Sequence, residues 1–466
     1  MSLSRWQSLS LFALLATLVL ASLPSSSSGE DSNDRLDPGL RIPGQYIVVL
    51  KDSVTDVEAA ESDILGRGGE RLDSYRSALR GFAARFSDEE LAAVASDPRV
   101  AFVSEDRVVS TMEGRPLREG TFGTARERTD RRMDPPPPPS PAPSPTPPPP
   151  PPVSEQAVAS SVQSLPTGVD RIDAESLLNT GANVNVAVID TGILASHPDL
   201  SGKIVGGKNC TRASGGYTDQ NGHGTHVAGT IAANNNTQGV VGVAPGAKLW
   251  SVRVLDRNGN GTWSSVICGL DYVTSKAPSK GGPIRVANLS LGGGGFSDNN
   301  CGNSNNDALH KAICRARDAG VTIVVAAGNS GVNAANAVPA AYDDAVITVS
   351  ALADTDGKPG GAGAATSYGA DDTFASFSNW GSAVDIGAPG VWIKSTWLKN
   401  GYATISGTSM ASPHVAGAAA LYIFKNPAAT WTTVRDALVA KGEALGAGHT
   451  DPSGNHPEKV LNASSL

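Results

Sequence analysis

Ser409 is the side chain in this sequence that is best placed to act as a nucleophile. It lies in GTSMASPHVAG, where a small-residue turn leads into an apolar segment, so we expect its hydroxyl at the start of a helix. The unpaired backbone N–H groups of a helix start would stabilise negative charge that develops beside the serine. A serine in this position is more often only an N-cap, so a catalytic role requires a base and an acid that orients the base.

Both partners are available elsewhere in the chain. His223 lies between two glycines in NGHGTH, at the start of another predicted helix. Asp190 ends the apolar run VNVAVID, and a carboxylate there needs a fixed partner because its burial is costly. A histidine held by a carboxylate can take the proton from a serine hydroxyl and return it to a leaving amine. The sequence therefore predicts a hydrolytic triad of Asp190, His223 and Ser409.

The elements that would position these residues alternate between strands and helices from residue 163 onward. The predicted strands are apolar, β-branched runs at 184–190, 249–255, 286–291, 321–327 and 346–352, and the predicted helices lie at 223–233, 266–275 and 305–319. Such continuous apolar runs indicate a buried parallel sheet that is covered by helices on both faces, an α/β doubly wound fold. Asp190 and Asn329 fall at or just beyond the carboxyl ends of strands, where the sites of such sheets gather.

A smaller α+β unit precedes this region. Its predicted strands are 45–51, 80–87 and 100–110, and its predicted helices are 56–66 and 88–96, the second capped by Ser87. The unit contains neither histidine nor cysteine, so we expect no chemistry in it.

Composition and the remaining segments limit the partners and the location. The formal net charge of -8 argues against nucleic acid or an anionic membrane as the main partner. Residues 1–24 resemble a secretory signal, and a membrane anchor is the less favoured alternative because the apolar run is short. Residues 113–157 form a basic and then proline-rich linker with a possible processing site at Arg131 and Arg132. We expect an extracellular or vacuolar protein without a membrane span after signal cleavage.

Four sequence blocks carry a family resemblance. DTG at Asp190, HGTHVAG from His223, AAGN ending at Asn329 and GTSMASPHVAG around Ser409 resemble the signature blocks of the subtilases, the subtilisin and proteinase K-like serine proteases. The resemblance implies a subtilisin-like catalytic domain at 158–466 and, at 43–112, a ferredoxin-like inhibitory propeptide domain. It also implies a monomeric serine endopeptidase that acts on polypeptides, needs no organic cofactor and is made as a zymogen inhibited by its own propeptide.

The resemblance extends to individual site residues. Asn329 would donate its side-chain amide to the oxyanion, with help from the Ser409 N–H and from Thr408. The substrate would pair with an edge strand at Ser290, Leu291, Gly292 and Gly293. The specificity pocket would be lined by Ala326, Ala327, Gly328 and Ala337. Because these residues are small and uncharged, we predict a preference for large hydrophobic residues on the amino side of the cut bond.

A calcium site is also implied by the resemblance. The loop at 234–240 is similar to the high-affinity calcium loop of the subtilisins, and an asparagine-rich surface turn is the alternative. The predicted oxygen ligands are the side chains of Gln163, Asp199 and Asn236 and the carbonyls of Asn234, Gln238 and Val240. A second, weaker site would involve Asp385. A zinc site at His223 and His226 lacks further ligands at suitable spacing, and we expect His197, His226 and His414 to be structural.

The four cysteines allow three pairings, and we favour Cys301 with Cys314 and Cys210 with Cys268. Glycosylation sequons begin at Asn209, Asn235, Asn260, Asn288 and Asn462, of which Asn288 lies in a predicted core strand and should stay unmodified.

Two other functions remain open from sequence alone. A catalytically idle wall or matrix protein could be anchored by the proline tract. A lipase of the α/β-hydrolase type is the weaker alternative, because Ser409 does not lie in G-x-S-x-G and the order of the acid and the histidine differs.

Overall fold

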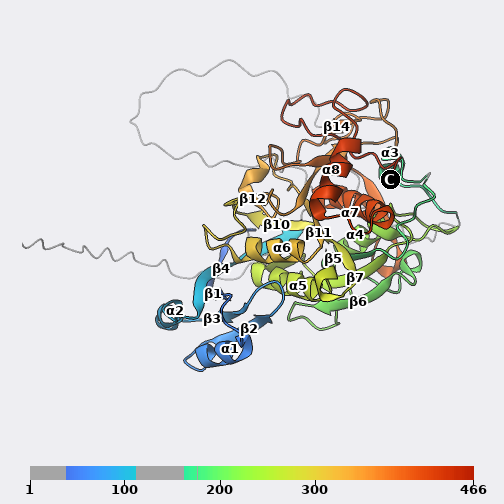
Figure 1. Cartoon of the computed structure of the whole chain (residues 1–466). Helices are drawn as coiled ribbons and strands as arrows, with labels where there is room; N and C mark the ends of the chain where they lie inside the picture. Colours follow the sequence, from blue (N-terminus) through green and yellow to red (C-terminus); the bar gives the residue numbers. More distant parts are fainter. Residues whose placement is uncertain (1–37, 112–161, 176) are drawn as a thin grey trace, which may run out of the picture. The chain divides into compact units, whose positions relative to one another are not determined.

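The computed structural model describes residues 38–111, 162–175 and 177–466 (Figure 1). The predicted signal segment at 1–24 and the predicted linker at 113–157 lie outside the described residues. Within the described ranges, no helix combines the length and the apolar character that crossing a bilayer requires.

Residues 41–111 form the N-terminal domain, a βαββαβ unit. Its elements are β1 (Arg41–Leu50), α1 (Val57–Leu65), β2 (Glu70–Tyr75), β3 (Gly81–Arg85), α2 (Asp88–Ala95) and β4 (Val100–Thr111). The strands run antiparallel in the order β4-β1-β3-β2, which is the ferredoxin-like arrangement. Ser87 caps α2 in a capping box with Glu90, as the sequence predicts. Strand β2 was not predicted, because its sequence ERLDSY is mostly polar.

Strand β1 contributes to two hydrophobic cores. Val48 and Leu50 pack with the helices of the N-terminal domain. Ile47 and Val49 point to the opposite face and belong to a core that also contains α5 and α6 of the following domain. Alternation along one strand therefore joins the two domains through apolar contact.

Residues 162–466 form the C-terminal domain around an eight-stranded sheet in the order β14-β13-β11-β9-β5-β7-β6, with β15 beside β13. All of its strands pair in parallel except β14. The strands are β5 (Asn185–Asp190), β6 (Ile204–Asn209), β7 (Lys248–Arg253), β9 (Ile284–Leu289), β11 (Thr322–Ala326), β13 (Ile347–Ala353), β14 (Thr373–Phe374) and β15 (Ile386–Pro389). The short strands outside it are β8 (Asn260–Thr262), β10 (Leu291–Gly294), β12 (Ala337–Val338), β16 (Ile393–Thr396) and β17 (Tyr402–Ile405).

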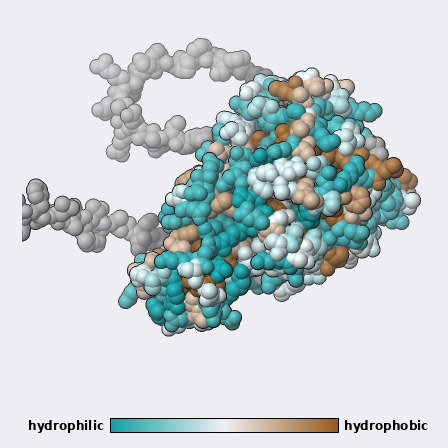
Figure 2. Space-filling view, viewed as in Figure 1, coloured by the Kyte–Doolittle hydropathy of each residue, from teal (hydrophilic) through white to brown (hydrophobic). Residues whose placement is uncertain are grey.

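Helices cover both faces of this sheet, which gives the predicted doubly wound α/β architecture (Figure 1). Val186 and Val188 of β5 pack in the core that contains α4 and α7, whereas Ala187 and Ile189 pack in the core that contains α5 and α6. The helices are α3 (Thr167–Arg171), α4 (His223–Ala232), α5 (Trp263–Ser275), α6 (Ala308–Asp318), α7 (Thr408–Lys425) and α8 (Trp431–Lys441). Short 3-10 helices lie at Pro198–Leu200, Pro278–Lys280, Ala334–Asn336 and Leu398–Asn400. On the face shown in Figure 2, hydrophilic residues predominate and hydrophobic residues form separate patches.

Two differences from the predicted elements have identifiable causes. The predicted strand 286–291 is divided at Ser290 into β9 and β10, because β10 leaves the main sheet to pair with β12 and β4. Strand β6 was not predicted because Gly206 and Gly207 interrupt its pattern. A side chain at position 206 would meet the Trp250 ring, since a Cβ placed there lies 2.4 Å from it.

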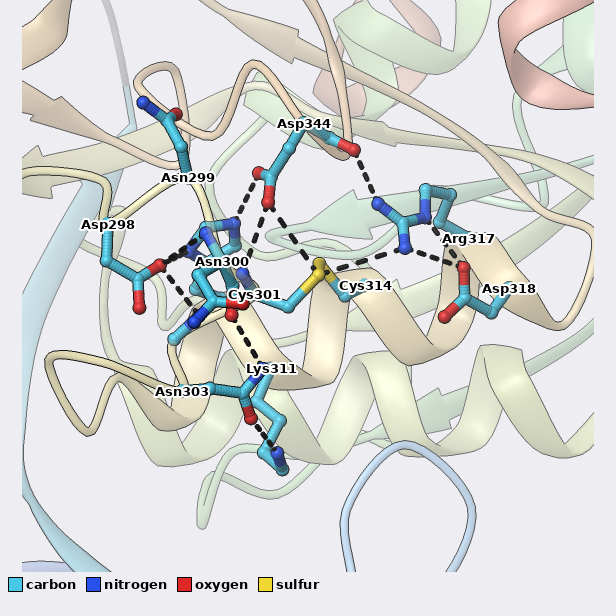
Figure 3. Close-up of a disulfide and its surroundings, with 12 residues drawn as sticks. Asp298, Asn299, Asn300, Cys301, Asn303, Lys311, Cys314, Arg317, Asp318 and Asp344 are labelled. Carbon is cyan, nitrogen blue, oxygen red and sulfur yellow. Dashed lines mark hydrogen bonds and ion pairs between the residues drawn. A yellow bond between two sulfur atoms is a disulfide. The ribbon is translucent and has the colours of Figure 1, made fainter.

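Two disulfides stabilise the C-terminal domain, and they are the pairings favoured from the sequence. Cys210 is joined to Cys268, and Cys301 is joined to Cys314. Figure 3 shows that the second bond ties the loop before α6 to the body of that helix, with Asp344 and Arg317 on either side of the sulfur atoms. The carboxylate of Asp344 accepts a hydrogen bond from the Cys301 N–H at 3.1 Å.

Candidate active site

Helix α7 places Ser409 in its first turn, as the sequence predicts. Gly407, at the N-cap, lets the chain enter the helix with a φ of 156°, and Thr408 is the first helical residue. The Ser409 hydroxyl is buried and donates to the carbonyl oxygen of Ser290 at 3.1 Å. In return, the Ser290 hydroxyl donates to the Ser409 carbonyl at 2.8 Å. These two bonds fix the start of α7 against the junction between β9 and β10.

Asp190 and His223 form a buried pair at the carboxyl end of β5. The Nδ1 atom of His223 lies 2.8 Å and 2.9 Å from the two carboxylate oxygens of Asp190, and both side chains are fully buried. Glycine on both sides of His223 allows this approach. A Cβ at Gly224 would lie 2.2 Å from the carbonyl oxygen of Gly192, and Gly222 has a φ of 113°. The geometry holds the imidazole by Nδ1 against the carboxylate.

Asp219 is a buried carboxylate that the sequence reasoning missed. It accepts hydrogen bonds from the Thr191 hydroxyl at 2.9 Å, and from both the hydroxyl and the N–H of Thr225 at 2.6 Å and 2.9 Å. It also accepts from the N–H groups of Asn221 and Gly222. Asp219 thereby connects the turn after Asp190 to the turn that carries His223. The sequence offers one indication of this role, namely that Asp219 lies four residues before His223, in a segment with the composition of a polar loop.

The side-chain amide of Asn329 contributes a buried hydrogen-bond donor to the site. Its Oδ1 atom accepts from the Thr408 N–H at 2.9 Å and from the Thr408 hydroxyl at 2.8 Å, which fixes the orientation of the amide. Its Nδ2 atom is buried and has no hydrogen-bond partner in the described part of the chain. An unsatisfied buried donor is costly, so such a group is expected to meet a ligand. Because the Thr408 hydroxyl gives its proton to Asn329, Thr408 orients that donor.

A peptide strand already lies on the predicted substrate edge. Strand β4 of the N-terminal domain pairs antiparallel with β10, with Thr111 opposite Leu291 and Ser110 opposite Gly292. On its other side β4 pairs with β8, and the Thr111 N–H donates to the carbonyl of Gly259 at 3.0 Å. The end of β4 is therefore held between two edges, which is strand addition. Gly293, which completes the predicted edge, pairs with Val338 of β12.

The small residues predicted to line the specificity pocket lie at the end of β11 and in β12. Ala326 and Ala327 are buried, and Gly328 turns the chain with a φ of 108°. A Cβ at Gly328 would lie 2.3 Å from the amide nitrogen of Asn379. That amide, which the sequence reasoning also missed, donates to the Ala327 carbonyl at 2.9 Å. Ala337 pairs with Gly294 across β12 and β10, and its side chain packs with other alanines.

Three other buried histidines, which the sequence analysis expects to be structural, contact backbone groups. The Nε2 atom of His226 lies 2.9 Å from the Ile393 carbonyl, and burial lowers the pKa of His226 to about 3. The Nδ1 atom of His414 lies 2.8 Å from the Met410 carbonyl, and burial lowers the pKa of His414 to about 4. The His197 ring bridges the Gly401 carbonyl and the Asp199 N–H.

The residues predicted to bind calcium lie close together around the loop after α4. The side-chain nitrogen of Gln163 lies 2.8 Å from the Asn234 carbonyl and 3.2 Å from the Val240 carbonyl, so these two oxygens converge. Asp199 is buried, and its carboxylate accepts from the Val240 N–H at 2.8 Å. The side-chain nitrogen of Asn236 lies 3.5 Å from an oxygen of the same carboxylate. The Asn236 side-chain oxygen accepts from the N–H of Gln238, which folds the loop back on itself. An oxygen-rich set of this kind fits a hard cation such as Ca²⁺.

Asp385 has different surroundings. Its carboxylate accepts from the Thr348 N–H at 2.8 Å and lies 3.9 Å from the Arg435 guanidinium. Burial raises the pKa of Asp385 to about 7.

The comparisons with known proteins agree with this geometry. The model of the subtilase family matches residues 181–455, and the model of the peptidase inhibitor I9 family matches residues 45–112. An extracellular serine proteinase from Thermus sp. (strain Rt41A) is 37% identical over 465 residues, which cover 92% of this chain and 93% of that protein. Subtilisin DY from Bacillus licheniformis is 40% identical over 290 residues, which cover 61% of this chain and 93% of that protein. The crystal structure of a cold adapted subtilisin-like serine proteinase matches with a TM-score of 0.52 and 37% identity, covering 64% of this chain and 97% of that one. The chain therefore belongs to the subtilase family of serine endopeptidases and carries an inhibitor I9 domain ahead of its peptidase domain.

Proposed function

We propose that the chain is a secreted endopeptidase that cuts peptide bonds through an acyl-enzyme formed on Ser409, and that its N-terminal domain inhibits it until processing. The pairing of β4 with β10 is the observation that carries this proposal. It lays a polypeptide along an edge that leads to Ser290, whose carbonyl contacts the Ser409 hydroxyl. The extracellular location named for the Thermus relative supports secretion, whereas no comparison supports a vacuolar location.

The proposed reaction assigns a role to each residue of the site. Asp190 holds His223 by Nδ1, and Nε2 takes the proton from the Ser409 hydroxyl as its oxygen attacks the peptide carbonyl. The negative charge that develops on the carbonyl oxygen is stabilised by the Asn329 side-chain N–H and the Ser409 backbone N–H. His223 then gives its proton to the leaving amine, and water hydrolyses the acyl-enzyme by the same steps in reverse order.

Labelling by a fluorophosphonate tests the role of Ser409. The processed protein should be labelled in a single position, and Ser409→Ala should abolish both the labelling and the activity. Absence of labelling in processed protein that remains folded would favour the idle matrix-binding alternative. Asp318→Ala, which changes an exposed residue at the end of α6, is the matched control.

The lining of the pocket supports a broad specificity with a preference for large hydrophobic residues. Ala326, Ala327 and Gly328 are small and uncharged, so a pocket that they line would accept a bulky side chain and would offer no carboxylate to a basic one. Cleavage of a peptide library should therefore enrich aromatic and long aliphatic residues before the cut bond. A strict preference for arginine or lysine would contradict this proposal.

We further propose that Ca²⁺ binds among Gln163, Asp199 and the loop at 234–240. A rotation of the Gln163 amide would present its oxygen beside the converging carbonyls of Asn234 and Val240. The ion would bind the folded loop and not the unfolded chain, so it would stabilise the fold by mass action. Chelation should lower the melting temperature of the Ser409→Ala chain, and Asp199→Asn should remove most of this response.

A further inference from the structure

A long glycine-rich loop joins β13 to β14 at residues 354–372. Its sequence, DTDGKPGGAGAATSYGADD, contributes almost nothing to the hydrophobic cores, and its own regular structure is limited to an isolated bridge between Thr366 and Gly369. Loops of this length without a core are costly to order, since every glycine loses much conformational freedom. Polar contacts hold much of it, among them hydrogen bonds from the Gly360 and Gly361 N–H groups to the Asp372 carboxylate.

Three carboxylates meet where the loop leaves and rejoins the sheet. One oxygen each from Asp354, Asp356 and Asp371 lies within 4.8 Å of the others. Asp354 and Asp371 are 1% and 5% exposed, whereas Asp356 opens to solvent. Three like charges this close, two of them out of water, repel one another unless a cation or protons neutralise them.

An independent observation points to a missing ligand. The Oδ1 atom of Asp354 accepts from the Gly357 N–H at 3.0 Å, but its Oδ2 atom is buried and has no hydrogen-bond partner among the described residues. In Asp371, by contrast, both oxygens accept hydrogen bonds from Thr355 and Gly363. The loop thus supplies donors to the second buried carboxylate and none to Asp354 Oδ2.

No side-chain cation in the described part of the chain satisfies this oxygen. Arg171 is the buried cation nearby, but it is committed to Asp372 at 2.6 Å and to Glu443 at 2.9 Å. Over the described ranges, none of the three clustered carboxylates forms an ion pair with lysine, arginine or histidine.

We propose that Asp354, Asp356 and Asp371 form a second calcium site, separate from the loop at 234–240 and from Asp385. Carboxylate oxygens are the ligands that Ca²⁺ prefers, and it accepts the irregular geometry that an open, partly solvated loop offers better than Mg²⁺ does. Water would complete the coordination on the exposed side. The ion would fasten both ends of the loop to the end of β13 and protect the loop from local opening.

Gly357 shapes this site. It has a φ of 77°, and a Cβ there would lie 2.7 Å from the carboxylate oxygen of Asp170. The turn from Asp354 to Gly357 therefore depends on glycine, and it returns the chain so that Asp356 faces the two buried acids.

The test uses the full-length Ser409→Ala chain, which cannot digest itself. Bound Ca²⁺ is counted by equilibrium dialysis, and hydrogen exchange is followed at residues 355–371 and 234–240 with and without Ca²⁺. Asp356→Asn is the main variant because this side chain is exposed and its loss should leave the fold intact. Asp318→Asn, an exposed acid paired with Arg317, is the control.

The expected result is one fewer bound Ca²⁺ in Asp356→Asn and loss of the calcium-dependent slowing of exchange at 355–371. The response at 234–240 and the behaviour of Asp318→Asn should stay unchanged. Asp354→Asn should abolish the same response while stabilising the loop in chelator, because it removes the unpaired charge. The proposal would be overturned if Asp356→Asn bound as many Ca²⁺ ions as the parent chain, or if Ca²⁺ did not change the exchange rate at 355–371 in the parent chain. Equal protection by Mg²⁺ at the same concentration would overturn the choice of calcium.

Discussion

Replacing Asp271 should weaken inhibition by the N-terminal domain. Asp271 lies on α5, and one of its carboxylate oxygens accepts hydrogen bonds from three consecutive backbone N–H groups of the N-terminal domain. These belong to Arg76, Ser77 and Ala78, at 2.9, 2.6 and 2.7 Å. The carboxylate thus holds the loop between β2 and β3 without touching the catalytic residues.

The size of the effect follows from these contacts. A hydrogen bond to a charged group contributes about 1.5–3 kcal/mol when it is buried. Three such bonds share one partly exposed carboxylate and are not additive, so we expect a net loss of about 2–4 kcal/mol for Asp271→Ala, or roughly 30- to 1000-fold in the inhibition constant. Asp271→Asn keeps an acceptor but loses the charge, so its effect should be intermediate.

The assay measures the initial-rate inhibition of the processed enzyme by an excess of the N-terminal domain from the wild-type chain, before the added domain is digested. Hydrolysis of a short chromogenic peptide gives kcat/KM, which should stay the same in both variants because Asp271 is remote from the cleft. Asp318→Ala serves as the control on a neighbouring surface. An inhibition constant within twofold of wild type in Asp271→Ala would show that these three hydrogen bonds do not hold the domain, and the reasoning would fail.

Four further predictions concern other parts of the molecule. Asn329→Ala should lower kcat by about 10²- to 10³-fold with little change in KM, because it removes the oxyanion donor; steady-state kinetics measure this. Burial raises the pKa of Asp73 from its ordinary value of 3.8 to about 7. The docked domain therefore favours the protonated acid, and inhibition should be strongest at low pH and weaken as the pH rises to about 7. Asp73→Asn should reduce the pH dependence of the inhibition constant measured from pH 5 to 8. Replacing Cys301 and Cys314 by serine should lower the free energy of unfolding by about 3 kcal/mol on the chain-entropy estimate for their separation of 13 residues, measured by denaturant titration. Finally, the register that places Thr111 opposite Leu291 predicts a first cut after Met112, which lies outside the described residues. N-terminal sequencing of the first processing product should therefore begin at Glu113, and a first cut at Arg132 would contradict this register.

Site residues that lie in short, recognisable motifs could be predicted from the sequence. Asp190 and His223 could be paired because each is costly to bury alone and each ends or begins a predicted element, and the structure places them within 2.9 Å. The doubly wound fold followed from apolar runs whose alternate residues face two cores. The roles proposed for these residues remain predictions until they are tested by substitution.

Residues that hold other parts of the site in place through contacts between distant segments could not be predicted from the sequence. Asp219 and Asn379 look like ordinary loop residues, and only the fold shows that their side chains hold the turns around the site. The division of the strand at Ser290 depends on pairing with distant β4 and β12, which no local pattern indicates. The acids at 354, 356 and 371 are too far apart in sequence to suggest a cluster, and the partnerless oxygen of Asp354 can be seen only in three dimensions.

Because β1 packs on both of its faces, release of the N-terminal domain should be irreversible. While the N-terminal domain is docked, Ile47 and Val49 are buried against the following domain together with Tyr75 and Leu79. Departure would leave one face of a small sheet in water with only the core behind Val48 and Leu50, which is too little for such a short chain to remain firmly folded. The released domain should therefore loosen and become a substrate of the enzyme that it inhibited. Each freed enzyme molecule would then destroy the inhibitor available to its neighbours, so that release behaves as a one-way and self-amplifying event.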